Sequence, residues 1–144
     1  MRIYLDNCCY NRPFDDQSQI RIRLEAEAKL YVQDSVRRGD LELVWSYILD
    51  FENEANPFEE RRSTIMEWRQ IAKMDVEESG HVLQTARVLQ KSGLRAKDAL
   101  HVSCAIAAGC QYFITTYDII IKRLQGNEEI TGIDPIGFVK DTSQ

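Results

Sequence analysis

Four acidic residues, far apart in the sequence, are spaced in a way that would suit a metal site. Asp6 follows the short apolar run "RIYL", and Asp118 follows the strand-like run "QYFITTY". Glu52 and Asp98 lie in segments with helical periodicity. Four carboxylates at one place repel one another, and divalent cations relieve that repulsion. Mg²⁺ and Mn²⁺ prefer oxygen ligands, and a two-metal site activates water and stabilises a leaving oxygen. The four acids therefore favour phosphodiester hydrolysis.

Each of these acids also has a simpler interpretation, because most of the 23 aspartates and glutamates must be solvated surface charges. Asp6 fits a turn or cap, and Asp98 fits an acid favoured by the dipole at a helix N-terminus. Asp118 fits the start of the next helix, and Glu52 fits a solvated helix face. Spacing alone leaves both interpretations open.

The predicted elements bring the four acids to one edge of a sheet. The predicted strands are short apolar runs at residues 2–6, 41–45, 111–117 and 132–139, and the run at 74–76 fits a strand or a connection. The predicted helices have 3.6-residue periodicity and span 17–38, 46–56, a stretch after Pro57, 77–91, 96–108 and 119–124. Residues 7–16 are predicted to form a loop. Alternating strands and helices favour an α/β fold with a parallel sheet, which binds ligands beyond the carboxyl ends of its strands.

Helical spacing also predicts which side chains face the core. These core positions are Ile20, Leu24, Tyr31 and Val36 in the first long helix, Phe58, Ile65, Trp68 and Ile71 after Pro57, Val82, Ala86 and Leu89 in the next, and Leu100, Ala105 and Ala108 in the alanine-rich helix. Ser46 is predicted to cap the helix that follows the second strand.

Length and composition indicate a single globular domain spanning residues 1–144. Hydrophobic residues make up 44% of the chain, with no apolar run near the roughly 20 residues that span a bilayer and no readable signal peptide. We therefore expect a cytoplasmic protein without membrane contact, and reduced cysteines. The net charge of −5 argues against nucleic-acid binding through a broad basic surface, but it allows an enzyme whose acids bind metal ions.

The segments that carry the four acids resemble those of PIN-domain proteins. The resemblance rests on "YLDNCC", "SYILDFE" and "KDALHVSCAIAAGCQYFITTYD", in this order. It implies a Rossmann-like three-layer α/β/α sandwich with a mainly parallel sheet, and an endoribonuclease that depends on Mg²⁺ or Mn²⁺. Many small PIN proteins are toxins of VapBC-type toxin–antitoxin modules. The resemblance thus also implies RNA as the substrate, an antitoxin protein as a partner, and a homodimer.

The resemblance assigns roles to individual residues. Its acidic quartet, which would bind the metal and carry catalysis, corresponds by position to Asp6, Glu52, Asp98 and Asp118. Asp50 and Glu54 are alternatives to Glu52 as the second acid of the quartet. Residues two apart on a helix point about 200° apart, so only one of the three need face the site. Thr116 and Asn7 are expected to support the acids. His101 shares a helix face with Asp98 and suits packing or support better than base catalysis.

Basic residues close to the acids in sequence are candidates for contacts with phosphates, namely Arg12, Arg95 and Lys97. Two other functions stay open at this point. A PIN-like module without catalysis would bind RNA or protein, and an aspartyl-phosphate phosphotransferase would share the strand-then-Asp opening. The second is weak, because Cys8 stands where a dehalogenase-type phosphatase needs an aspartate, and Lys140 is a poor match for the lysine of receiver domains.

Overall fold

The first strand lies at the centre of a parallel sheet. In the computed structural model, which describes residues 1–143, five strands are arranged in the order β3-β2-β1-β4-β5. They are β1 (Arg2–Leu5), β2 (Glu42–Ser46), β3 (Met74–Val76), β4 (Tyr112–Ile114) and β5 (Thr131–Ile133). All neighbouring strands are parallel. The carboxyl ends of β1, β2 and β4 therefore meet at one edge, as the sequence predicts.

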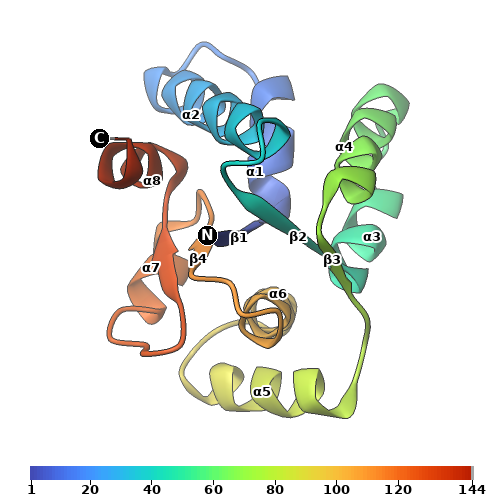
Figure 1. Cartoon of the computed structure of the whole chain (residues 1–144), viewed down its shortest axis with the longest axis vertical. Coiled ribbons are helices and arrows are strands. Elements are labelled where there is room, and N and C mark those ends of the chain that lie inside the picture. Colours follow the sequence, from blue (N-terminus) through green and yellow to red (C-terminus); the bar gives the residue numbers. More distant parts are fainter. Residues whose placement is uncertain (144) are drawn as a thin grey trace.

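Helices cover both faces of the sheet. They are α1 (Asn7–Asn11), the 3₁₀ helix η1 (Arg12–Phe14), α2 (Ile20–Arg37), α3 (Tyr47–Glu54), α4 (Glu59–Ile71), α5 (Gly80–Lys91), α6 (Ala96–Ala107), α7 (Asp118–Arg123) and α8 (Pro135–Thr142). Figure 1 shows α5 and α6 on one side, and α1, α2, α4 and α8 on the other. The predicted three-layer α/β/α sandwich is confirmed.

Local sequence signals account for several element boundaries. Ser46 ends β2 and caps α3, since its Oγ accepts a hydrogen bond from the Leu49 amide at 3.3 Å. Gly109 has a φ of 73°, a conformation that a side chain disfavours, and it turns the chain from α6 toward β4. Glu52 and Asp98 thus lie on α3 and α6, two helices that begin at the edge of the sheet where β1, β2 and β4 end.

Two predicted segments differ from the structure. The predicted loop at 7–16 contains α1 and η1, because Asp6 caps α1 and Pro13 fits the start of a helical turn. The predicted strand at 132–139 is correct only in its first part, where β5 ends at Ile133. Asp134 then caps α8 by accepting a hydrogen bond from the Gly137 amide at 2.7 Å, and Pro135 occupies the first turn.

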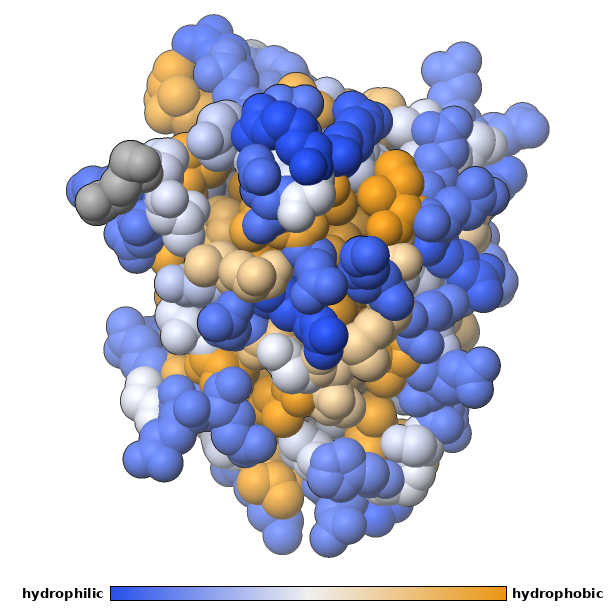
Figure 2. All heavy atoms as spheres, in the orientation of Figure 1, coloured by the Kyte–Doolittle hydropathy of each residue, from blue (hydrophilic) through white to orange (hydrophobic). Residues whose placement is uncertain are grey.

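The predicted core face of α2 is largely wrong. Ile20, Leu24 and Tyr31 are exposed by 58%, 44% and 45%, and Val36 alone of the four is buried. Helix α2 packs against η1 and α8 with a face that includes polar side chains, among them Glu25, Lys29 and Gln33. Apolar periodicity did not identify this face, because some of its interior contacts are made by charged residues. Figure 2 shows apolar side chains among hydrophilic ones on one face of the molecule.

The other predicted core positions are mostly correct. Phe58 and Ile71, at the two ends of α4, are exposed, whereas the positions between them are buried. Buried predicted positions are Ile65, Trp68, Val82, Ala86, Leu89, Ala105 and Ala108, and Leu100 is partly buried. The four cysteines are free, as expected. Within residues 1–143, none of the helices has the length and apolar character needed to cross a membrane.

Candidate functional site

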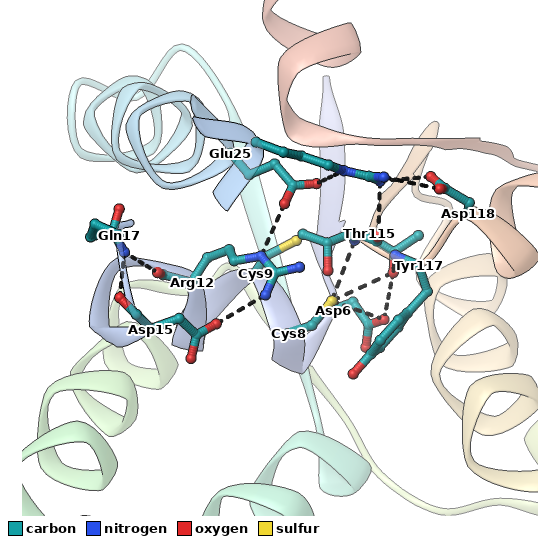
Figure 3. Close-up of polar contacts among 12 residues, drawn as sticks. Asp6, Cys8, Cys9, Arg12, Asp15, Gln17, Glu25, Thr115, Tyr117 and Asp118 are labelled. Carbon is teal, nitrogen blue, oxygen red and sulfur yellow. Dashed lines mark hydrogen bonds and ion pairs between the residues drawn. The ribbon is translucent and has the colours of Figure 1, made fainter. Parts of the chain in front are cut away.

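Asp6 occupies the carboxyl end of the central strand and is almost fully buried. Its Oδ1 accepts a hydrogen bond from the Asn7 amide at 2.8 Å, and its Oδ2 accepts one from the Thr115 hydroxyl at 2.8 Å. The Cys8 thiol lies 3.6 Å from the same Oδ2. Figure 3 shows Cys8 and Thr115 beside Asp6. These donors fix the carboxylate and lower the cost of burying it.

A cleft of about 870 Å³ opens in front of Asp6 and is also lined by Glu52 and Asp98. Burial raises the pKa of Asp98, and the negative charges of Asp6 and Glu52 raise it further, although His101 and Arg95 act in the opposite direction. The three carboxylates are therefore close enough to sense one another. Such mutual repulsion is what a bound cation would relieve.

Of the three acids on α3, Glu52 is the one that lines the cleft. Asp50 instead accepts a hydrogen bond from the Trp45 indole at 2.8 Å and lies 3.7 Å from Arg69. Glu54 is exposed and lines a different surface hollow. The rotation of about 200° between residues two apart thus separates Glu52 from Asp50 and Glu54, in line with the sequence argument.

A buried hydrogen-bond chain connects Glu52 to the core of the sheet. His101 Nε2 contacts Glu52 Oε1 and lies 3.9 Å from Asp6 Oδ1. Its Nδ1 lies 2.6 Å from the Tyr4 hydroxyl, which lies 2.6 Å from the Ser46 hydroxyl. Burial lowers the pKa of His101, but the hydrogen bond that its Nε2 donates to Glu52 and the charges of the surrounding carboxylates outweigh burial and raise it. His101 therefore orients Glu52, in line with the supporting position expected from sequence.

The structure does not bring Asp118 to the other three acids. Its carboxylate forms a two-pronged ion pair with Arg21 of α2, at 2.8 and 3.1 Å, and its side chain is 72% exposed. Arg21 lowers the pKa of Asp118. Figure 3 shows Asp118 apart from Asp6, while the preceding Tyr117 lies closer to it. Tyr117, which the sequence analysis did not select, lines the cleft instead.

The hydroxyl group that contacts Asp6 belongs to Thr115 and not to Thr116. Successive side chains of an extended segment point in opposite directions, so only one of the two can face Asp6. The Thr116 hydroxyl is buried without a hydrogen-bond partner among residues 1–143, and its amide donates to Cys8 Sγ at 3.4 Å. The doubled "TT" in the sequence signalled a hydroxyl at this edge without showing which one. Asn7 lines the cleft and holds Asp6 through its backbone amide.

The three basic residues selected from the sequence, Arg12, Arg95 and Lys97, all line the cleft. Arg12 is held by Glu25 and Asp15, each at 3.0 Å. Arg95 precedes the first turn of α6 and is exposed.

Arg61 of α4 also lines the cleft, and the sequence analysis missed it. It donates to the Phe14 carbonyl at 2.6 Å and packs over the Phe58 ring, 4.5 Å from its centre. The site thus combines one buried carboxylate, Asp6, and two partly buried ones with basic side chains around them.

The donor set suits a hydrated oxygen-seeking cation. Among residues 1–143, no three His, Cys, Asp or Glu side chains are already arranged as a complete metal site. Mg²⁺ does not need one, because it keeps several waters and binds through one or two carboxylates plus substrate phosphate. Asp6, Glu52 and Asp98 line one cleft, and the pKa of Asp98 is raised partly by the other two. These three side chains can supply the carboxylate ligands that Mg²⁺ uses.

Comparison with solved structures supports the fold. No protein-family model matches the chain, and no curated protein does. The structure matches one chain of the crystal structure of VapBC2 from Rickettsia felis bound to a DNA fragment from its promoter, with a TM-score of 0.57. The alignment covers 93% of this chain and 98% of that chain, at 12% identity. The two chains share a fold. At this identity the likeness concerns the architecture alone.

Proposed function

We propose that this protein is a divalent-metal-dependent endoribonuclease and the toxin component of a VapBC-type toxin–antitoxin module. The observation that carries the proposal is the convergence of Asp6, Glu52 and Asp98 on one cleft. They come from three segments that are distant in the sequence. The fold shared with a VapBC2 chain and the resemblance to PIN domains support the same function.

The three cleft acids are the proposed metal-binding and catalytic residues. Bound Mg²⁺ or Mn²⁺ would supply Lewis-acid chemistry, by lowering the pKa of a bound water and neutralising phosphate charge. Asp6 is held for this task by Thr115 and by the Asn7 amide. Glu52 is oriented by His101. The resemblance also assigns Asp118 to the metal, but its ion pair with Arg21 leads us to propose the other three as the ligands.

The basic residues of the cleft are proposed to hold the RNA backbone. Arg95 and Lys97 stand next to Asp98 at the start of α6, and Arg61 approaches from α4. Phosphate contacts position a nucleic acid without reading its bases. A few local contacts reconcile RNA binding with the net charge of −5. An antitoxin protein and a second copy of the chain are the proposed protein partners.

Calorimetric titration of the metal-free protein with Mn²⁺ tests the proposal. The wild type should bind Mn²⁺, and Asp6→Asn and Asp98→Asn should lose binding and RNA cleavage while they stay folded. Asp34→Asn is a matched control, because Asp34 is a surface acid paired with Arg38. Unchanged cleavage in both cleft variants would reveal a contaminating nuclease and sink the proposal.

A second candidate function is a catalytically idle PIN-like module that binds RNA or protein. The ion pair between Asp118 and Arg21 favours it, because it engages an acid that the resemblance assigns to metal. Absence of Mn²⁺ binding by the wild type near neutral pH, together with retained RNA binding, would select this function over the nuclease.

A further inference from the structure

A second hollow uses the same α1–η1 segment as the cleft but different side chains. It has a volume of about 160 Å³ and lies between that segment, α2 and α4. Tyr10, Pro13 and Phe14 line it, whereas Asn11 and Arg12 line the cleft. We call it the Lys29 pocket, after the lysine of α2 that is buried in it.

The Lys29 pocket concentrates buried hydrogen-bond donors that the protein does not pair. Lys29, Gln33 and Tyr10 are exposed by 3%, 4% and 0%. Tyr10 Oη and Gln33 Nε2 have no hydrogen-bond partner among residues 1–143. Lys29 contacts the faces of two rings, with its Nζ 5.3 Å from the centre of Tyr10 and 6.0 Å from that of Trp68. Three donors from two elements therefore line one small space.

The charges around the pocket add to this excess of donors. Arg37 stands at its edge over the Trp68 ring, 4.6 Å from the ring centre. The nearby buried acid, Glu25, is already engaged by Arg12 at 3.0 Å and by Arg21 at 3.4 Å. Glu67 also lines the pocket but is exposed to solvent. The interior is thus positive, with its one acidic lining residue in water.

Burying an ammonium group without an anionic partner is costly. Burial lowers the pKa of Lys29 from 10.5 to about 7, with a further lowering by Arg37 and a partial offset from Cys9. The ring faces of Tyr10 and Trp68 recover part of the cost through cation–π attraction. A buried donor without a hydrogen-bond partner still carries the full cost of its lost hydration. An anion in the pocket would remove these penalties together.

We propose that the Lys29 pocket binds the carboxylate of a small organic acid with a flat or apolar body. The ammonium of Lys29, the amide NH₂ of Gln33 and the hydroxyl of Tyr10 would donate to the two carboxylate oxygens, which accept about four hydrogen bonds. The Trp68 and Phe14 rings and Ile65 provide apolar walls for the body. A cavity of about 150 Å³ is large enough to bind benzene, so a pocket of about 160 Å³ suits a small acid.

Titration with benzoate, followed by the indole N–H signals in ¹H–¹⁵N NMR, tests the proposal. Trp68 reports on the pocket, and Trp45, whose indole is bonded to Asp50, serves as an internal control. We expect a saturable shift of the Trp68 signal and none of comparable size for Trp45. Lys29→Met should weaken binding by about tenfold or more, since a charged hydrogen bond is lost. Lys91→Met, an exposed lysine on α5, should bind as the wild type does.

Several outcomes would overturn the proposal. Benzyl alcohol shifting Trp68 with the same affinity would show that the pocket does not recognise the charge. Absence of a saturable shift would show a pocket that holds water only. Unchanged affinity in a folded Lys29→Met variant would remove the lysine from the site. If that variant does not fold, Gln33→Met serves in its place, with weakened benzoate binding expected. Binding of N-acetylglutamate N-methylamide in place of benzoate would indicate the side chain of a protein partner and reject the small acid.

Discussion

The oxygens of Asp6 in the acidic cleft receive hydrogen bonds from Thr115 and from the Asn7 amide, whereas Tyr10 Oη and Gln33 Nε2 in the Lys29 pocket have no hydrogen-bond partner among residues 1–143. Both sites lie beside residues 7–14. The cleft contains a buried negative charge, Asp6, and the pocket contains a buried positive charge, Lys29. The cleft is larger, at about 870 Å³ against 160 Å³. The carboxylate of Asp6 is thus stabilised by protein donors, whereas the ammonium of Lys29 is stabilised by the faces of the Tyr10 and Trp68 rings.

The two sites offset the free-energy cost of burying a charge in different ways. A carboxylate that accepts hydrogen bonds from protein donors, as Asp6 does, can hold a cation. A buried ammonium without an acceptor responds by a lowered pKa, as Lys29 does. The cleft suits cations and chemistry, and the pocket suits recognition of an anion.

The sharpest separation between the two regions should appear in RNA cleavage. Asp6→Asn should lower the rate by about 100-fold or more, because metal-bound charge stabilisation is worth several kcal/mol. Lys29→Met should leave the rate within about threefold, since it acts at a distinct site. Single-turnover cleavage of a labelled RNA in Mn²⁺ measures both. A comparable loss in Lys29→Met would show that the two regions act as one.

The pH dependence of the free energy of unfolding should reveal the buried ammonium of Lys29. The folded-state pKa of Lys29 is lowered from 10.5 to about 7, so wild-type stability should fall as the pH falls from about 10.5 to 7 and remain low below that. Lys29→Met should stabilise the protein near pH 6.5, by roughly 5 kcal/mol at most, with a gain that shrinks toward pH 9.5. Urea unfolding across this pH range measures it, and Lys91→Met is the control. A gain that does not vary with pH would reject the burial argument.

Asp98 in the cleft should lower the stability of the metal-free protein by less than Lys29 does. Because the folded-state pKa of Asp98 is raised, its stabilising contribution is present at low pH and is lost as the pH rises above the usual carboxyl range. Asp98→Asn should therefore stabilise the metal-free protein at pH 7.5, by up to about 1 kcal/mol because Asp98 is only partly buried. The gain should vanish near pH 4. Thermal unfolding with and without Mn²⁺ tests this, since the metal should raise the wild-type melting temperature and not that of the variant.

Asp118 should give the smallest effect. Its ion pair with Arg21 lies on the surface, so Asp118→Asn should leave the melting temperature almost unchanged. We expect cleavage to fall by less than about tenfold, in contrast to Asp6→Asn. The same single-turnover assay decides it. A loss as large as that of Asp6→Asn would mean that Asp118 leaves Arg21 and reaches the metal, as the resemblance implies.

The sequence predicted the parts of the cleft that depend on local signals. Strand-end Asp6, the Ser46 cap that sets the rotation of α3, and the start of α6 before Asp98 are readable from short segments. Parallel strands then bring these segments to one edge. Thr116 escaped this logic, because a one-residue difference in an extended segment decides which side chain faces the site. Asp118 escaped it because its partner, Arg21, comes from α2, which is distant in the sequence.

Local patterns alone determined the alternation of strands and helices, the parallel sheet and three of the acids that line the cleft. Tertiary structure alone decided which face of α2 is buried, that Arg21 holds Asp118, and that Lys29, Gln33 and Tyr10 share a pocket. The physical reason is that apolar periodicity reports the face that hydrophobicity favours. The partners of a buried charge come from elements distant in sequence, and their arrangement exists only after the chain has folded.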